Sequence, residues 1–166
     1  MKGRVVALGL WLTLVATACA STSLSDYTPK DQAEAQIVAM LMRIPNGIKA
    51  RSVDLILTPY AEDVYIGHFQ KYLGVAGPDA PLSISKADLR GVYDQVFRAA
   101  KEVSMDVKDF RLQVSGDHAV AEARTELLFR QEARRGEARD QVYRNEVTWR
   151  LRRTAAGWKI VEEIWQ

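Results

Sequence analysis

The residues that could carry out nucleophilic or metal chemistry in this sequence are few. There is one cysteine, Cys19, and there are two histidines, His68 and His118. A single cysteine cannot form a disulfide within the chain or build a cysteine-based metal site. No carboxylate cluster lies beside either histidine, so the sequence predicts no metal site. It also contains no glycine-rich phosphate loop, nucleotide fingerprint or Ser-His-Asp arrangement, and we expect no cofactor.

One segment holds residue types suited to proton transfer. Asp63 lies between Tyr60 and Tyr65, and Tyr93 follows later in the chain. An aspartate base and acid donors in an apolar pocket can move a proton on a small hydrophobic molecule. However, Asp63 lies in a corner between two predicted elements, where aspartate is common because its side chain bonds to nearby backbone. The sequence therefore assigns no catalytic residue.

Cys19 lies at the end of a segment with the order of a secretory signal. Lys2 and Arg4 are basic, residues 5–16 are mainly apolar, and small residues precede the cysteine. The apolar stretch is too short to span a bilayer comfortably. The end resembles a lipobox, whose cysteine receives lipid chains, although Ala16 stands where a larger aliphatic residue is usual. We predict a signal over residues 1–20 and a membrane anchor at Cys19.

An alternative interpretation of the same segment remains open. Ala18-Cys19-Ala20 also fits an ordinary cleavage site, which would give a secreted soluble protein. No acidic residue follows the cysteine, and this favours the outer membrane or its periplasmic face if the host is Gram-negative. Residues 21–28 are small and polar, and are interpreted as a tether.

The composition is typical of one globular domain, which we place at residues 29–166. The chain has 166 residues, of which 48% are hydrophobic and 27% charged. Without Lys2 and Arg4, the remaining 21 basic residues equal the 21 acidic ones. A nucleic-acid-binding protein would show a basic excess, so the sequence argues against that class.

The front half of this domain has helical spacing. Apolar residues three and four apart predict a first helix that begins near Thr28 as its cap, with a kink or break at Pro45. Residues 52–58 predict a short second helix. Residues 85–97 predict the clearest helix, which opens with a capping box.

The back half has the spacing of long strands. From Val103 apolar residues alternate with polar ones, and their phase shifts by one residue near Lys108-Asp109, which predicts a β-bulge. Strands are expected over residues 103–114, 119–130, 141–153 and 158–165. The fold class is therefore α+β, with a curved antiparallel sheet and N-terminal helices packed on one face.

Several segments resemble the nuclear transport factor 2-like superfamily, which includes the SnoaL-like proteins. The resemblance covers about residues 30–166 and is carried by residues 57–64 (LTPYAEDV), 85–97, 116–119 (GDHA) and 157–161 (GWKIV). It implies a cone-like sheet whose concave face is closed by the helices, and members often dimerise through the sheet. Some members carry histidines in the closing strand, but Glu162 and Ile164 occupy those places here. The superfamily includes both enzymes and non-catalytic subunits, so the fold alone does not give the activity.

Two groups of residues are candidates for binding. The pocket-lining candidates are polar or aromatic residues expected on inner faces: Tyr65, His68, Tyr93, Asn145, Trp149 and Glu162. Glu162 is included because alternation places it with Trp158 and Ile160. The second group is a common outer face that either pairs with nearby acids or docks an anionic partner: Arg124, Arg130, Arg144, Arg150 and Arg152.

These observations favour a non-catalytic, membrane-anchored protein of the cell envelope. We expect its domain to bind a small apolar ligand or an envelope protein. The alternatives are a small-molecule isomerase, cyclase or hydrolase of the SnoaL-like type, and a structural subunit of an envelope complex.

Overall fold

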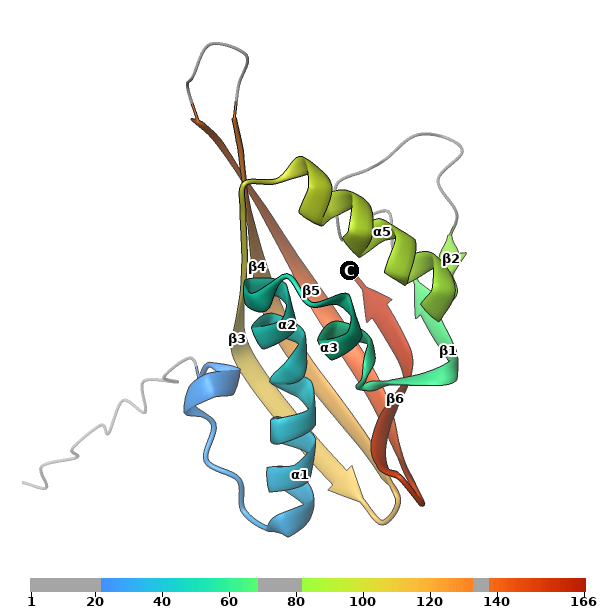
Figure 1. Cartoon of the computed structure of the whole chain (residues 1–166). Coiled ribbons are helices and arrows are strands. Elements are labelled where there is room, and N and C mark those ends of the chain that lie inside the picture. The colour runs from blue at the N-terminus through green and yellow to red at the C-terminus, as the bar shows by residue number, and fades with distance from the viewer. Residues whose placement is uncertain (1–21, 69–81, 133–137) are drawn as a thin grey trace, which may run out of the picture.

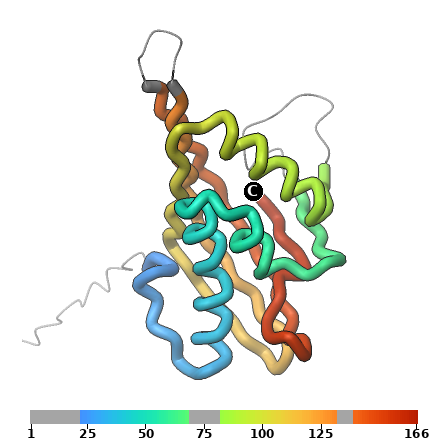
Figure 2. The backbone as a smooth tube through the Cα atoms, viewed as in Figure 1, coloured from blue at the N-terminus to red at the C-terminus, as the bar shows by residue number. Residues whose placement is uncertain are grey.

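The computed structural model describes residues 22–68, 82–132 and 138–166 (Figure 1). The predicted signal and Cys19 lie outside the described residues. A layer of helices covers one face of a curved sheet, and the backbone trace shows the same two layers (Figure 2). The α+β class and the packing of the N-terminal helices against the sheet are confirmed.

The helical layer contains α1 (Gln32–Leu41), α2 (Arg43–Ala50), α3 (Val53–Leu57) and α5 (Lys86–Ala99). The prediction that Thr28 caps the first helix is wrong, because the cap is Asp31, whose side chain accepts the Glu34 N–H at 2.8 Å. The capping box of α5 is confirmed, with Ser85 and Asp88 bonding to each other's backbone N–H.

The break between α1 and α2 confirms the effect predicted for Pro45. The two helices are separated by Met42, three residues before the proline. Proline has no N–H to donate to the carbonyl four residues earlier, so the helix of α1 cannot continue through this point. Gly47 then lets α2 approach α3 closely, because a Cβ there would lie 2.6 Å from Ile56 Cγ1.

The sheet has six strands in the order β2-β1-β6-β5-β4-β3. Their bounds are β1 (Tyr60–Gly67), β2 (Ser83–Ile84), β3 (Glu102–Ser115), β4 (His118–Glu132), β5 (Ala138–Thr154) and β6 (Gly157–Trp165). The sheet is antiparallel as predicted except at one pair, since β1 and β6 are parallel. The last strand inserts between β5 and β1, and its direction is fixed by the hairpin with β5.

The bulge predicted near Lys108-Asp109 is confirmed in β3. Lys108 faces Arg124 and Arg111 faces Glu122, so Asp109 and Phe110 together lie opposite one residue of β4. Asp109 has a φ of 53°. The shift turns Phe110 to the inner face, where Val107 lies before the bulge, and both side chains are buried.

Within the segment predicted as a tether, Thr22, Leu24 and Tyr27 contact the domain. The short 3-10 helix η1 (Leu24–Asp26) buries Leu24, and Phe110 N–H donates to the Thr22 carbonyl at 2.8 Å. Tyr27 packs edge-on against Phe110, with ring centroids 5.0 Å apart. These contacts make Thr22, Leu24 and Tyr27 part of the folded domain.

Candidate functional site

A buried carboxylate, Glu163, forms the centre of a hydrogen-bonded group on the inner face of the sheet. Its side chain accepts bonds from Tyr60 Oη at 2.6 Å, Trp149 Nε1 at 2.7 Å and Trp165 Nε1 at 2.8 Å. We call these four residues the Glu163 quartet. Glu163 is 1% exposed, and this burial raises the pKa of its carboxyl, while the three donors act in the opposite direction. The quartet ties together β1, β5 and β6.

The sequence prediction placed Glu162 at this position, and the structure corrects it. Register with β5 shifts between Arg150 and Leu151, because Val161 is an extra residue in β6. The shift turns Glu162 to the outer face, where it forms an ion pair with Arg150 at 2.6 Å. The sequence did contain a signal for this shift. Trp158 and Trp165 are both large and apolar but lie an odd number of residues apart, so a regular strand would place them on opposite faces.

Two of the other predicted pocket residues lie on the inner side of the molecule. Trp149 is buried within the quartet, and Tyr93 is buried on α5, with its ring centroid 5.9 Å from that of Phe97. Asn145 is half-buried on β5, and its backbone carbonyl accepts the Thr125 hydroxyl at 3.3 Å.

Tyr65 and His68, the other two pocket candidates on β1 and at its end, lie at the surface. Tyr65 is 48% exposed, and its ring lies over Gly67 on the outer face of β1. His68 is exposed at the end of β1 with a φ of 55°, and its Nδ1 lies 3.2 Å from the Trp165 carbonyl oxygen. Asp63 is exposed too, so the structure does not bring it to the buried Tyr60 hydroxyl.

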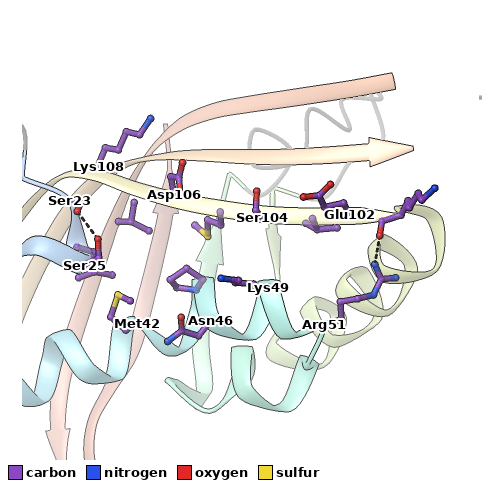
Figure 3. A pocket seen from close by; sticks show the side chains of 16 residues that line it. Ser23, Ser25, Met42, Asn46, Lys49, Arg51, Glu102, Ser104, Asp106 and Lys108 are labelled. Carbon is purple, nitrogen blue, oxygen red and sulfur yellow. Dashed lines mark hydrogen bonds between the residues drawn. The ribbon is translucent and has the colours of Figure 1, made fainter. Parts of the chain in front are cut away.

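An open groove lies between α2 and the edge of β3, and sequence reasoning did not predict it. Its volume is about 790 Å³. Figure 3 shows Asn46 and Lys49 of α2 across the groove from Ser104 of β3. One wall of the groove is β3 itself, since every residue from Glu102 to Lys108 lines it. Ser23–Ser25 close the end near Lys108, and Arg51 and Lys101 lie at the end near Glu102. We call this feature the β3 groove.

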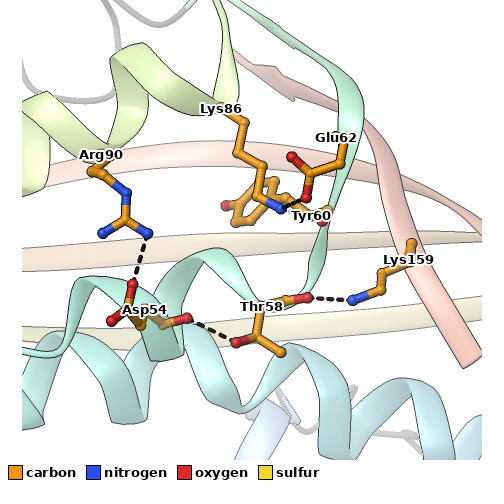
Figure 4. Close-up of polar contacts among 7 residues, drawn as sticks. All are labelled: Asp54, Thr58, Tyr60, Glu62, Lys86, Arg90 and Lys159. Carbon is orange, nitrogen blue, oxygen red and sulfur yellow. Dashed lines mark hydrogen bonds and ion pairs between the residues drawn. The ribbon is translucent and has the colours of Figure 1, made fainter. Parts of the chain in front are cut away.

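A polar corner fixes the segment just before β1 (Figure 4). Lys86 Nζ donates to the Tyr60 carbonyl at 3.0 Å and forms an ion pair with Glu62 at 2.7 Å. Lys159 Nζ donates to the Thr58 carbonyl at 2.6 Å, and burial together with the nearby Lys86 charge lowers the pKa of Lys159. These contacts orient Tyr60 toward Glu163 and give the corner a structural role.

The predicted arginine face is exposed and paired with acids. The ion pairs are Arg124–Asp109 at 3.0 Å, Arg130–Glu102 at 2.7 Å, Arg130–Asp140 at 2.8 Å, Arg144–Glu126 at 3.2 Å and Arg150–Glu162 at 2.6 Å. Arg152 is exposed. The pKa of Glu126 is lowered by its hydrogen bonds to Lys108 and Arg144. These acids neutralise much of the positive charge, as expected for a solvated face with cross-strand pairs.

The described residues contain no group of three His, Cys, Asp or Glu side chains arranged to hold a metal ion. None of the helices in the described ranges is long and apolar enough to cross a membrane. The Glu163 quartet and the β3 groove are therefore the two candidate sites within the described residues.

Comparisons with solved structures agree with this architecture. A protein from Kribbella flavida has a TM-score of 0.67 and 16% identity, over 81% of this chain and 89% of that one. An NTF2-like protein with a cystatin-like fold from Novosphingobium aromaticivorans has a TM-score of 0.60 and 18% identity, over 80% of each chain. A ketosteroid isomerase-like protein from Erwinia carotovora atroseptica has a TM-score of 0.52 and 21% identity, over 80% and 91%.

At these identities the likeness establishes the fold alone. No curated protein sequence matches the chain. The model of the SnoaL-like domain family matches residues 62–163, from within β1 to the buried glutamate of β6. This match spans more than half of the chain and agrees with the cone-like sheet and its helical cover. The chain belongs to the SnoaL-like domain family.

Proposed function

We propose that this protein is a lipid-anchored binding domain of the cell envelope, which docks a partner and does not transform a substrate. The observation that carries this proposal is the β3 groove, an open groove of about 790 Å³ along a strand edge that has no neighbouring strand among the described residues. A surface of this kind offers both side chains and backbone groups to a partner.

The state of the Glu163 quartet supports a non-catalytic role. Both carboxylate oxygens of Glu163 accept hydrogen bonds from neighbouring side chains, and the residue is 1% exposed. A general acid or base must come within hydrogen-bond reach of the group whose proton it transfers. The quartet instead stabilises the packing of β1 against β5 and β6.

The proposed anchor is Cys19, and the link from it to the domain is short. Cys19 precedes Thr22 by three residues, which span about 11 Å when fully extended. Thr22 is bonded to Phe110 at the β3 bulge. Lipid on Cys19 would therefore hold the η1 end of the β3 groove close to the membrane surface.

Metabolic labelling with an alkyne-bearing fatty acid tests the anchor. We expect the full chain to take up the label, and Cys19→Ser to lose it completely, because the thiol is the acylated group. Ser21→Ala, two residues away, should label like the natural sequence. Equal labelling of Cys19→Ser, or no labelling of the natural sequence, would contradict the anchor.

One observation favours a second candidate, an isomerase-type enzyme acting on a small hydrophobic molecule. Burial raises the pKa of Glu163, and its carboxylate lies 2.6 Å from the Tyr60 hydroxyl oxygen. A buried carboxyl beside a phenol is a pair that acid–base catalysis can use. Turnover of an unsaturated ketone that is abolished by Tyr60→Phe would favour this candidate over the docking domain.

A further inference from the structure

The β3 groove is lined by the backbone edge of a strand. β3 is the last strand in the sheet order, so one of its edges has no neighbouring strand among the described residues. Successive side chains of a strand point to opposite faces, so a cavity on one face is lined by alternate residues. Here all seven residues from Glu102 to Lys108 line the groove. The groove therefore runs along the strand's N–H and C=O groups.

At its other end, the same edge forms a backbone hydrogen bond with the segment that precedes η1. At the bulge, Phe110 N–H donates to the Thr22 carbonyl at 2.8 Å. Thr22 thus contacts the edge at the bulge, and the groove begins next to it, at Ser23–Ser25. An open edge of this kind is a template for another strand.

The groove offers apolar contacts below a charged rim. Val103, Met105 and Val107 are at most 7% exposed and form part of its lining, together with Met42 of α2. The charged lining residues are four cations and two acids: Lys49, Arg51, Lys101 and Lys108 with Glu102 and Asp106. Lys108 forms an ion pair with Glu126 and Glu102 forms one with Arg130, each at 2.7 Å. The other charged lining residues have a formal sum of +2, so the groove favours a ligand that carries acidic groups.

We propose that the β3 groove receives an extended, acidic segment of a partner protein, which adds to β3 as a further strand. This inference rests on the docking function proposed above and names the chemistry of its partner. A polypeptide satisfies the backbone groups of residues 102–108, whereas an acyl chain would cover them without hydrogen bonds. Alternate side chains of the added strand would face Val103 and Met105, and the others would face the rim.

The test uses hydrogen exchange of the full chain in detergent, with the probe acetyl-Glu-Val-Thr-Val-Glu-Val-Thr-amide. We expect the probe to slow exchange about tenfold at alternate amides within residues 102–108, because the new ladder protects them. The same peptide N-methylated at alternate residues should give no protection, since it cannot form the ladder. A lysine-for-glutamate version should bind about tenfold more weakly at low salt.

Two matched pairs of variants on α2 locate the site. Asn46 is exposed and lines the groove, whereas Arg43 is exposed on the same helix outside it. Asn46→Trp should abolish the protection by filling the groove, and Arg43→Trp should leave it unchanged. Lys49→Glu should weaken binding of the acidic probe about tenfold, and Arg43→Glu should not.

Other occupants would give different results. Protection of residues 102–108 without peptide, together with a dimer in native mass spectrometry, would mean that a second copy of the chain occupies the edge. Protection by a fatty acid but not by the peptide would assign the groove to lipid. Either result, or equal binding of the N-methylated probe, would overturn this inference. A missing lipid on Cys19 would overturn the anchor instead. Fatty-acid labelling tests the anchor and hydrogen exchange tests the groove, so the two failures can be told apart.

Discussion

At the scale of single residues, the Glu163 quartet is the feature with the strongest physical consequence. A carboxyl buried at 1% exposure is penalised in its charged form, so burial raises its pKa above the ordinary value. Between the unfolded and folded pKa values the folded protein binds more protons than the unfolded chain. The free energy of unfolding must then fall as pH rises through this window.

Glu163→Gln should remove this pH dependence, because an amide does not titrate. We expect the free energy of unfolding of the natural sequence, relative to Glu163→Gln, to be higher at pH 5 than at pH 8. Urea titrations followed by tryptophan fluorescence measure both proteins at both pH values. Glu162→Gln, on the outer face of the same strand, is the control. Its free energy of unfolding should depend on pH as that of the natural sequence does. Parallel curves for the natural sequence and Glu163→Gln would show that Glu163 has no raised pKa.

At the scale of elements, the contact of α2 with α3 depends on a missing side chain. A Cβ at Gly47 would lie 2.6 Å from Ile56 Cγ1 and 2.8 Å from Ile56 N, and the backbone atom cannot move aside cheaply. Gly91 on α5 has nothing within 4 Å of the same atom. The two glycines thus differ in packing although both are helical.

Alanine substitutions should separate these two positions. Gly47→Ala should lower the free energy of unfolding by about 1–3 kcal/mol through overpacking. Gly91→Ala should raise it by about 0.5–1 kcal/mol, because alanine is the better helix former. Thermal or urea unfolding measures both, and a stabilising Gly47→Ala would contradict the α2–α3 packing described here.

The elements also show which features a sequence can reveal. The bulge at Asp109 was predictable because Met105 and Val107 alternate in one phase and Phe110 and Leu112 in the other. The bulge at Val161 was missed because Glu162 and Glu163 are adjacent and identical, so the sequence does not show where the inward and outward positions exchange. Simple alternation from Trp158 then placed Glu162 on the inner face in place of Glu163. The parallel pairing of β1 with β6 and the β3 groove depend on how distant segments meet, and local spacing carries no information on that.

At the scale of the whole molecule, the described domain combines a large buried core with an edge strand, β3, that pairs on one side only among the described strands. The inner face of the sheet carries large buried side chains, including Trp149, Trp158 and Trp165. The β3 groove lies at the margin of this core, next to the segment that leads back toward Cys19.

Native mass spectrometry of the protein extracted from its own membrane tests the proposed function most directly. We expect a chain that begins at Cys19, carries acyl groups on that residue and retains a polypeptide partner. The partner should dissociate from Asn46→Trp and remain bound to Arg43→Trp. An unmodified chain cleaved after Ala20, or a bound small molecule that is converted during incubation, would contradict a lipid-anchored docking domain.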